Sequence, residues 1–366
     1  MNWKKMIQGT GALMLSAAIP LTSSIEIGEA TKAGNAIRYF MQKPEAKGSS
    51  TPYGNNKAAG HYVQADDAKI YYEVYGKGKP LFVFHGGGVG TPYEMGQMID
   101  NLRKDYQVIV VSTRGHGRSE IGHSKLTYEQ KANDMLAVMK EVTNEPAILL
   151  GFSDGAYTAY KVASMYPDRA ERVIAIGAGT LKAGFFSGEM KVEDLAKIDA
   201  AFIEQQKRIM PEPERYQEFC DSYMNFWSKM EVGEDFLQTI QCPVLLIAGD
   251  EDDHAPLVTM VEAEQYIPQA SLCIVPKAWH TAFLDNFDVT WAAIEQFLQT
   301  DMSQLTGSKK VDYNESKMSR GCKLRALGGA NAPPSLFVEA LSRKASKRYS
   351  LNDSQGGARG FIVNTV

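Results

Sequence analysis

The sequence predicts an α/β fold in which a mostly parallel sheet is flanked by helices. Short apolar runs of strand length recur through the middle of the chain, and stretches with helical spacing of apolar residues alternate with the later runs. Strands that alternate with helices in this way form a parallel sheet covered on both faces. In such a sheet, ligands bind in the crevice at the carboxyl ends of the strands.

The elements follow from these patterns in chain order. The first is a hairpin near residues 61–75. Six further strands are predicted at residues 80–84, 107–112, 147–151, 172–177, 242–248 and 271–275. Helices that alternate with the later strands are predicted at residues 127–143, 154–166, 256–266 and 285–300. The last helix has apolar residues at helical spacing, including Phe287, Trp291 and Ile294.

The alternation stops between residues 180 and 241, where the chain is helical and rich in aromatic residues. Phe219, Tyr223, Phe226 and Trp227 recur at helical spacing and form one apolar face. This face can pack on the sheet domain, or it can cap a substrate site and line an apolar pocket. Different side chains can serve the two roles, and we expect Tyr223 and Phe226 to contact substrate.

The segment Gly151-Phe152-Ser153-Asp154-Gly155 lies between a predicted strand and a predicted helix. A serine between two glycines at such a turn is the pattern of a nucleophile elbow. The turn strains the serine backbone, and small neighbours are needed because the helix and the strand approach closely. The hydroxyl of Ser153 is then presented above the sheet edge, at the positive end of the helix.

A serine hydroxyl needs a base, and an elbow serine takes its acid and then its histidine from later in the chain. Of the six histidines, only His254 and His280 follow Ser153. His280 lies on a loop just after the apolar run at residues 272–275, and we predict that it is the base. We interpret His254, inside an acidic loop, as a bystander.

The acid is expected in the loop that follows the strand at residues 242–248. That loop carries four consecutive carboxylates, Asp250, Glu251, Asp252 and Asp253. One of them should be buried against the imidazole to fix its tautomer, and the other three should be solvated or cap the next helix. The residues alone leave the choice among the four open.

An oxyanion site is predicted in the loop His85-Gly86-Gly87-Gly88, which follows an apolar strand. Glycines let the backbone turn its N–H groups toward a substrate oxygen. The expected donors are the N–H groups of Gly87 and Asp154. A phosphate-binding loop is disfavoured, because no Gly-Lys-Ser or Gly-Lys-Thr follows and the glycine spacing does not fit a dinucleotide motif.

From about residue 60 to residue 298 the chain resembles the α/β-hydrolase superfamily. The likeness rests on the strand that leads into the His85 loop, on Arg114-Gly115-His116-Gly117, on the elbow, on the acidic loop and on His280. It implies the α/β-hydrolase fold with a small helical cap. It also selects Asp252 as the acid, by its distance from Gly249 and Pro256. Trp279 stands where such proteins often have glycine, and we expect it, with Phe152, to line the substrate site.

The resemblance implies a serine hydrolase that cleaves a small carboxylic ester through an acyl-enzyme, with Ser153, His280 and Asp252 as the catalytic triad. The elbow and the insert are most similar to small-ester and lactone hydrolases, valacyclovir-hydrolase-like proteins and C–C bond hydrolases. C–C bond hydrolysis, aminopeptidase activity and perhydrolysis on the same triad stay open. So does a ligand sensor of low turnover. A serine at the elbow argues against the branches that use aspartate there.

Composition agrees with an enzyme that acts on small molecules. The chain has 366 residues, 44% of them hydrophobic, which is enough for a large core. The formal net charge of −4 and the lack of a basic, aromatic stripe argue against nucleic acid as a partner. The proposed chemistry needs no metal or organic cofactor. The four cysteines show no metal-binding spacing, and Cys242 and Cys273 fall in or beside predicted core strands.

The two ends of the chain differ from the domain predicted for residues 61–300. Residues 1–30 combine a short basic start with an apolar stretch too short to span a bilayer, which predicts a signal peptide. We therefore expect export to the periplasm or beyond, without stable membrane insertion; a cytoplasmic protein is the alternative. Residues 31–60 are predicted to be a linker. Residues 301–366 carry eleven basic and five acidic side chains and are predicted to be a disordered tail.

Overall fold

The structure is a computed structural model that describes residues 37–46 and 48–306. The predicted signal peptide and all but the first six residues of the predicted tail lie outside this range, so both stay predictions. Within the described residues, no helix is both long enough and apolar enough to cross a membrane.

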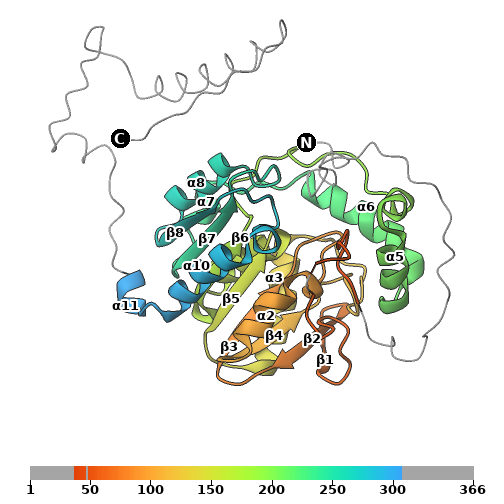
Figure 1. The fold of residues 1–366 in the computed structure, drawn as a ribbon, viewed down its shortest axis with the longest axis horizontal. Coiled ribbons are helices and arrows are strands. Elements are labelled where there is room, and N and C mark those ends of the chain that lie inside the picture. The colour runs from red at the N-terminus through yellow and green to blue at the C-terminus, as the bar shows by residue number, and fades with distance from the viewer. Residues whose placement is uncertain (1–36, 47, 307–366) are drawn as a thin grey trace, which may run out of the picture. The chain divides into compact units, whose positions relative to one another are not determined.

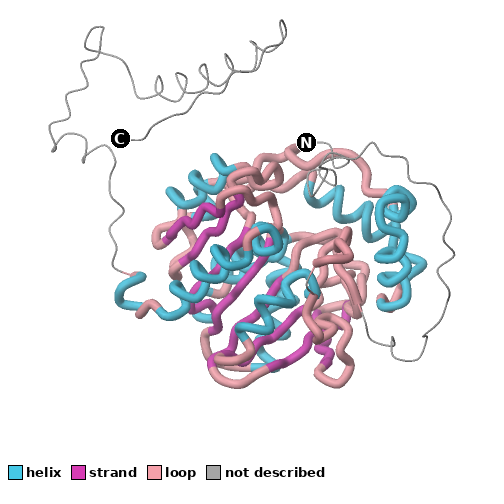
Figure 2. The backbone as a smooth tube through the Cα atoms, viewed as in Figure 1, coloured by secondary structure: helices cyan, strands magenta, loops and turns pink. Residues whose placement is uncertain are grey.

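Eight strands form one sheet in the order β1-β2-β4-β3-β5-β6-β7-β8 (Figures 1 and 2). They are β1 (Gly60–Ala65), β2 (Ala68–Tyr75), β3 (Lys79–Phe84), β4 (Tyr106–Val111), β5 (Ala147–Phe152), β6 (Ala170–Ile176), β7 (Val244–Gly249) and β8 (Ala270–Val275). β1 and β2 form an antiparallel hairpin, β2 pairs antiparallel with β4, and all the other pairings are parallel. The predicted hairpin and six strands are confirmed, with every end of the six within two residues.

Helices cover both faces of the sheet, and the strands supply each face with alternate residues. On β3, Phe82 and Phe84 face a core that contains side chains of α3 (Tyr128–Val142), α4 (Asp154–Met165) and α8 (Leu257–Tyr266). Leu81 and Val83 face a second core with side chains of α2 (Gly96–Leu102) and α10 (Phe287–Gln299). The shorter helical segments are η1 (Pro92–Met95), η2 (Pro167–Arg169), η3 (Pro213–Arg215), α7 (Glu234–Leu237), α9 (Ala282–Asp285) and α11 (Met302–Leu305).

The insert between β6 and β7 contains α5 (Val192–Ile209), α6 (Tyr216–Trp227) and α7, and Figure 1 shows α5 and α6 beside each other. The aromatic face of α6 packs on the loop after β4, because the rings of Phe219 and Tyr223 contact His116 at centroid distances of 4.9 and 5.2 Å. α5 is broken at Asp199, whose backbone is not helical (φ −145°, ψ 79°). The Asp199 carboxylate accepts the Phe202 N–H at 3.1 Å and so caps the second half of the helix.

Residues 37–46 and 48–59, which the sequence analysis assigns to a linker, pack against the domain instead. Tyr53 is fully buried, and its hydroxyl donates to Asp100 at 2.7 Å. The backbone N–H groups of Gly54 and Asn56 donate to the buried carboxylate of Glu73 on β2. Aromatic residues scattered in a polar segment therefore provide enough apolar surface and hydrogen bonding to fix it in place.

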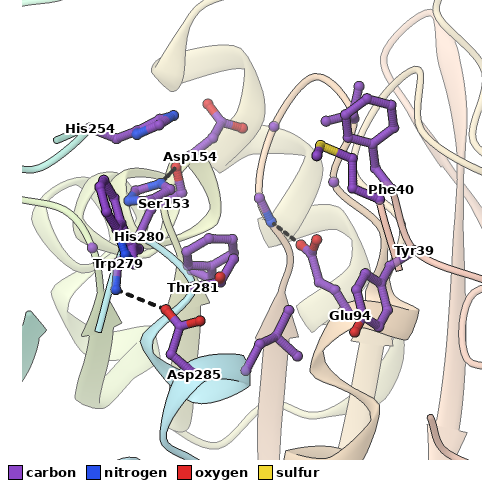
Figure 3. Close-up of a pocket in the computed structure, with 18 of the residues that line it drawn as sticks. Tyr39, Phe40, Glu94, Ser153, Asp154, His254, Trp279, His280, Thr281 and Asp285 are labelled. Atoms are coloured by element: carbon purple, nitrogen blue, oxygen red, sulfur yellow. Dashed lines mark hydrogen bonds between the residues drawn. The ribbon is translucent and has the colours of Figure 1, made fainter. Parts of the chain in front are cut away.

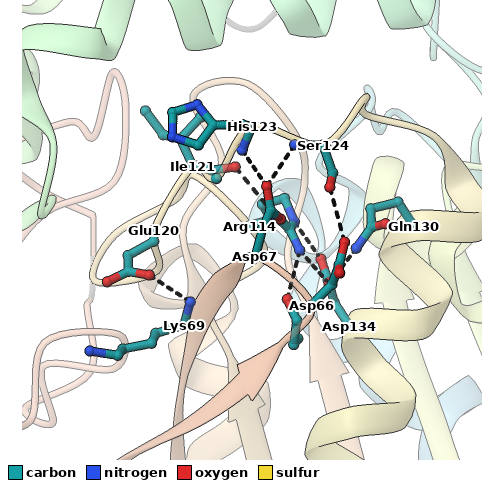
Figure 4. A network of polar contacts seen from close by, with 12 residues as sticks. Asp66, Asp67, Lys69, Arg114, Glu120, Ile121, His123, Ser124, Gln130 and Asp134 are labelled. Atoms are coloured by element: carbon teal, nitrogen blue, oxygen red, sulfur yellow. Dashed lines mark hydrogen bonds and ion pairs between the residues drawn. The ribbon is translucent and has the colours of Figure 1, made fainter.

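Arg114 joins three parts of the fold (Figure 4). Its guanidinium forms two hydrogen bonds of 2.8 Å with Asp134 on α3, one with the Ala65 carbonyl and an ion pair with Asp67 in the β1–β2 turn. The Arg114 and Asp134 side chains are both almost fully buried. Bidentate pairing satisfies both charges, which makes the loss of one partner costly.

We predict that Arg114→Met lowers the free energy of unfolding by about 3–5 kcal/mol, because it leaves the Asp134 carboxylate buried without its cation. Urea unfolding measures the change. Lys79→Met is the control, since Lys79 is half exposed and its pair with Glu171 should contribute at most about 1 kcal/mol. Similar losses in the two variants would contradict this account of Arg114.

Candidate active site

The turn between β5 and α4 holds Ser153 in a strained conformation. Its φ of 52° and ψ of −119° lie in a region that non-glycine residues rarely adopt. A Cβ atom at Gly151 would lie 2.4 Å from the Gly155 carbonyl oxygen, and one at Gly155 would lie 2.3 Å from the Phe84 carbonyl oxygen. Both positions therefore require glycine, because the helix and the strand approach each other closely, as the sequence pattern predicts.

Ser153, His280 and Asp252 form a continuous hydrogen-bonded chain. His280 Nε2 lies 2.8 Å from Ser153 Oγ, and His280 Nδ1 lies 2.9 Å from Asp252 Oδ2. Figure 3 shows the serine and the imidazole side by side at the cavity. The three residues follow the carboxyl ends of β5, β7 and β8; β7 and β8 are adjacent in the sheet, and β6 lies between β5 and β7. The structure thus brings together the three side chains that the sequence analysis selects, while their catalytic role stays a prediction.

The surroundings of Asp252 favour its ionised form. Its carboxylate is buried, and its Oδ1 accepts the backbone N–H groups of His254 and Ala255 at 2.8 and 2.9 Å. Burial alone would raise the pKa of Asp252, but the charge and hydrogen bond of His280 and the Ala255 N–H outweigh it and lower the pKa to about 2. Asp252 is therefore a charged acceptor that orients the His280 ring at neutral pH.

The other three acidic residues of this loop have different partners. Asp250 accepts the Ala278 N–H at 3.3 Å, Glu251 pairs with the exposed Lys277 at 2.9 Å, and Asp253 lies 2.6 Å from His254 Nδ1. The expectation that one of them could cap the next helix is not met, since α8 has Pro256 at its N-cap position and no side-chain cap.

His254 is closer to the site than the sequence analysis expects. Its ring stacks on His280, with centroids 4.5 Å apart and planes inclined by 15°. Asp252, His254 and His280 also place ligand-type atoms within 4.8 Å of one another. Both ring nitrogens of His280 already contact Asp252 and Ser153, so an ion bound there would have to displace one of these hydrogen bonds. The arrangement fits a packed triad better than a metal site.

The two expected oxyanion donors lie together beside Ser153. Asp154 is the first residue of α4, so its N–H has no acceptor within the helix and lies at the positive helix end. A Cβ atom at Gly87 would lie 2.9 Å from the Asp154 Cβ, which puts the two backbones next to each other. Both residues line the same cavity as Ser153. Their role as donors stays a prediction.

A cavity of about 620 Å³ opens in front of Ser153. Phe152 and Trp279 line it, as expected, but Tyr223 and Phe226 do not. Tyr223 is fully buried with its hydroxyl 2.8 Å from Lys131 Nζ, and Phe226 packs on the Tyr128 ring. Trp227 and Met230 line the cavity from this insert instead. Helical spacing gives the apolar face of α6, but it does not tell which of the adjacent positions points into a cavity.

Sequence analysis also missed a buried ion pair at the elbow. Lys131 on α3 pairs with the Asp154 carboxylate, and both side chains are about 1% exposed. The hydroxyls of Tyr128 and Tyr223 lie 3.2 and 3.4 Å from this carboxylate, and the Trp227 indole N–H lies at 3.4 Å. The elbow is thereby connected to α6 of the insert. A lysine in the apolar stripe of α3 is the signal that could have revealed the pair.

A second missed group is Glu94, which lines the cavity away from Ser153 (Figure 3). Its carboxylate accepts the Gly86 N–H at 3.1 Å. Burial raises the pKa of Glu94 to about 8, and the hydrogen bonds from Gly86 and Thr91 only partly oppose this shift. The cavity therefore contains a carboxyl group that is mostly protonated at neutral pH.

Comparison with known proteins agrees with this architecture. A family model described as "alpha/beta hydrolase fold" matches residues 79–208. AB hydrolase superfamily protein YisY of Bacillus subtilis is 25% identical over 65% of this chain and 98% of its own length. Serine hydrolase BPHL of Homo sapiens is 23% identical over 72% of this chain and 94% of its own. The chain is a member of the α/β-hydrolase superfamily.

A solved structure has the same fold as this α/β hydrolase. The serine hydrolase CarC, which is involved in carbazole degradation, matches with a TM-score of 0.56 at 20% identity, over 65% of this chain and 98% of CarC. Membership of the superfamily, together with relatives that are themselves hydrolases, identifies the chain as a hydrolytic enzyme.

We predict a pH effect on stability from Glu94. Between its ordinary pKa of 4.5 and about 8, Glu94 holds a proton in the folded enzyme and has lost it in the unfolded chain. Unfolding then releases a proton, so the contribution of Glu94 to stability is complete below pH 4.5 and is lost as the pH rises to about 8. Glu94→Gln removes this dependence. Urea unfolding of both proteins at about pH 5 and about pH 9 measures it.

The exposed carboxylate of Glu189 gives a matched control, since Glu189→Gln removes a charge without changing the cavity. A wild-type enzyme that loses no more stability than Glu94→Gln across this pH range would contradict the assignment of a protonated Glu94.

Proposed function

We propose that this α/β hydrolase is a serine hydrolase that cleaves a small carboxylic ester, or a related acyl bond, through an acyl-enzyme. The observation that carries the proposal is the chain Ser153–His280–Asp252, with contacts of 2.8 and 2.9 Å, at the wall of a cavity. The name of the relative BPHL, a serine hydrolase, points to the same class of chemistry.

In the first step, His280 Nε2 takes the proton of Ser153 as the hydroxyl oxygen attacks the carbonyl carbon. The buried Asp252 carboxylate accepts from His280 Nδ1 and stabilises the imidazolium that forms. The N–H groups of Gly87 and Asp154 stabilise the negative oxygen of the tetrahedral intermediate. His280 then protonates the leaving alcohol, and the acyl group stays on Ser153.

In the second step, water replaces the alcohol. His280 takes a proton from the water, whose oxygen attacks the acyl carbon, and the acid product leaves as Ser153 regains its proton. These steps use only groups of this chain and water. The stack of His254 on His280 and the contact of Phe152 with the same ring, at a centroid distance of 4.9 Å, support the imidazole from two sides.

The cavity supports a small, mostly apolar substrate. Its volume of about 620 Å³ falls within the range of pockets for small molecules. Aromatic side chains of Phe152, Tyr157, Trp227 and Trp279 line it beside the polar groups of the triad. We propose that the enzyme acts outside the cytoplasm and binds neither nucleic acid nor a membrane. N-terminal sequencing of exported protein should find a start just after the predicted signal peptide, residues 1–30.

Labelling with a fluorescent fluorophosphonate tests the nucleophile. We expect the wild-type enzyme to be labelled and Ser153→Ala to give no label, because the reagent bonds only to an activated serine. Gel fluorescence measures the result, and circular dichroism checks that the variant is folded. A folded wild-type protein that resists labelling would favour a ligand sensor over an enzyme.

Substitutions in the acidic loop test the orienting acid. We predict that Asp252→Asn lowers kcat by about 10³–10⁴-fold, because an amide no longer holds the productive tautomer of His280. Asp250→Asn and Asp253→Asn are matched controls in the same loop and should have much smaller effects. Steady-state kinetics on p-nitrophenyl esters measures all three, and a dominant loss at Asp250 would refute the assignment of Asp252.

A further inference from the structure

A segment before the first strand forms part of the cavity wall. Five residues of the N-terminal arm, which we define as residues 38–46, line the cavity: Tyr39, Phe40, Met41, Lys43 and Ala46. Figure 3 shows Tyr39 and Phe40 across the cavity from Ser153 and His280, with Tyr39 next to Glu94. This wall is not part of the sheet domain or of the insert, and the sequence analysis assigns it to a linker.

The arm is hydrogen-bonded to α5 through its backbone. The Arg38 N–H donates to Gln205 Oε1, and Gln205 Nε2 donates back to the Arg38 carbonyl, both at 2.8 Å. The Met41 N–H donates to Asp199 Oδ2 at 2.8 Å, and the Arg38 guanidinium pairs with the same carboxylate at 2.9 Å. Asp199 and Gln205 are each about 7% exposed. Without the arm, both buried side chains would lose hydrogen-bond partners, which is costly.

Apolar contact and backbone strain indicate that the arm has one defined position. The Phe40 ring packs edge-on against the fully buried ring of Phe202 on α5, with centroids 5.3 Å apart. Met41 has a φ of 58°, a conformation that a non-glycine residue keeps only where its surroundings hold it. The Asp199 hydrogen bond to its N–H is one such restraint.

The chain is fixed again just after the arm. The Tyr93 hydroxyl donates to the carbonyl of the buried Ser49 at 2.9 Å. Tyr93 precedes Glu94, the carboxyl group on the same side of the cavity as Tyr39. The arm is thus attached to α5, and the chain is fixed again near η1 shortly after the arm ends; Lys43 and Ala46 line the cavity between these two points.

We propose that the N-terminal arm, held on α5 by Gln205 and Asp199, is a specificity-determining wall that limits the length of the ester this enzyme accepts. The inference rests on the proposed function. Phe40 occupies space at the far end of the cavity from Ser153, so a longer acyl or alkyl chain would have to displace it. Release of the arm should open this end without disturbing the triad, because no arm residue contacts Ser153, His280 or Asp252 through a hydrogen bond among the described residues.

Chain-length profiles of full-length variants test the proposal. Phe40→Ala removes the wall side chain, and Gln205→Leu removes both side-chain bonds to Arg38 while it keeps a similar volume. For each protein, kcat/KM is measured on p-nitrophenyl esters from acetate to decanoate and on acetate esters of alcohols of increasing length. In both variants we expect the ratio of long-chain to short-chain kcat/KM to rise at least about tenfold in one of the two series, since a methylene in an apolar pocket changes kcat/KM by this order.

Lys207→Met is the matched control, because Lys207 lies on α5 and pairs with Glu204 at the surface. Its chain-length ratio should equal that of wild type. Ratios that stay at the wild-type value in both Phe40→Ala and Gln205→Leu, or that change as much in Lys207→Met, would overturn the proposal.

A readout that needs no turnover separates this inference from the proposed function. Hydrogen exchange at residues 38–46 should be slow in wild type and Lys207→Met and faster in Gln205→Leu. Equal exchange in the three proteins would overturn the attachment of the arm to α5, whether or not esters are cleaved. A wild-type protein that hydrolyses no ester and resists fluorophosphonate, yet shows the expected exchange, would refute the proposed function and leave the arm as the wall of a ligand site.

Discussion

The strained backbone of Ser153 is the constraint on which the site depends. A φ of 52° at a non-glycine residue persists only where the surrounding structure holds the backbone, and here β5, α4 and the end of β3 pack closely around the turn. Their close approach leaves no room for a Cβ atom at Gly151 or Gly155. The same turn points the hydroxyl at His280 and starts α4 at Asp154, whose N–H has no acceptor within the helix. One local geometry therefore presents the hydroxyl and a hydrogen-bond donor in the cavity together.

The rest of the molecule is built around this turn by buried polar contacts. Asp154 brings a carboxylate into the core, and Lys131 together with groups from α6 satisfies it. A buried charge tolerates the loss of its partner poorly, so the Asp154 carboxylate depends on Lys131 of α3, and the polar groups of α6 add weaker contacts. On the other side, Asp199 and Gln205 of α5 hold the N-terminal arm. The insert thus contacts the turn through one helix and the cavity wall through the other.

The sequence predicts those features that depend on short-range patterns. Strand and helix positions follow from apolar periodicity, and the partners of Ser153 follow from the order of loops at the carboxyl ends of β5, β7 and β8. The four carboxylates after β7 could not be separated by residue type, because only the turn geometry decides which one reaches His280. Tyr223 and Phe226 were wrongly expected at the cavity, since neighbouring positions on α6 differ in direction while sharing the same periodic signal. The arm was missed because its hydrogen bonds come from buried side chains more than 150 residues away in the sequence.

A crystal structure of the enzyme after reaction with an alkyl phosphonate would test the central claim most directly, because the adduct mimics the tetrahedral intermediate. The account predicts a bond from Ser153 Oγ to phosphorus, with the phosphoryl oxygen within hydrogen-bond distance of the Gly87 and Asp154 N–H groups and the alkyl chain in the cavity. An adduct on another residue, or a phosphoryl oxygen that points away from both N–H groups, would contradict it.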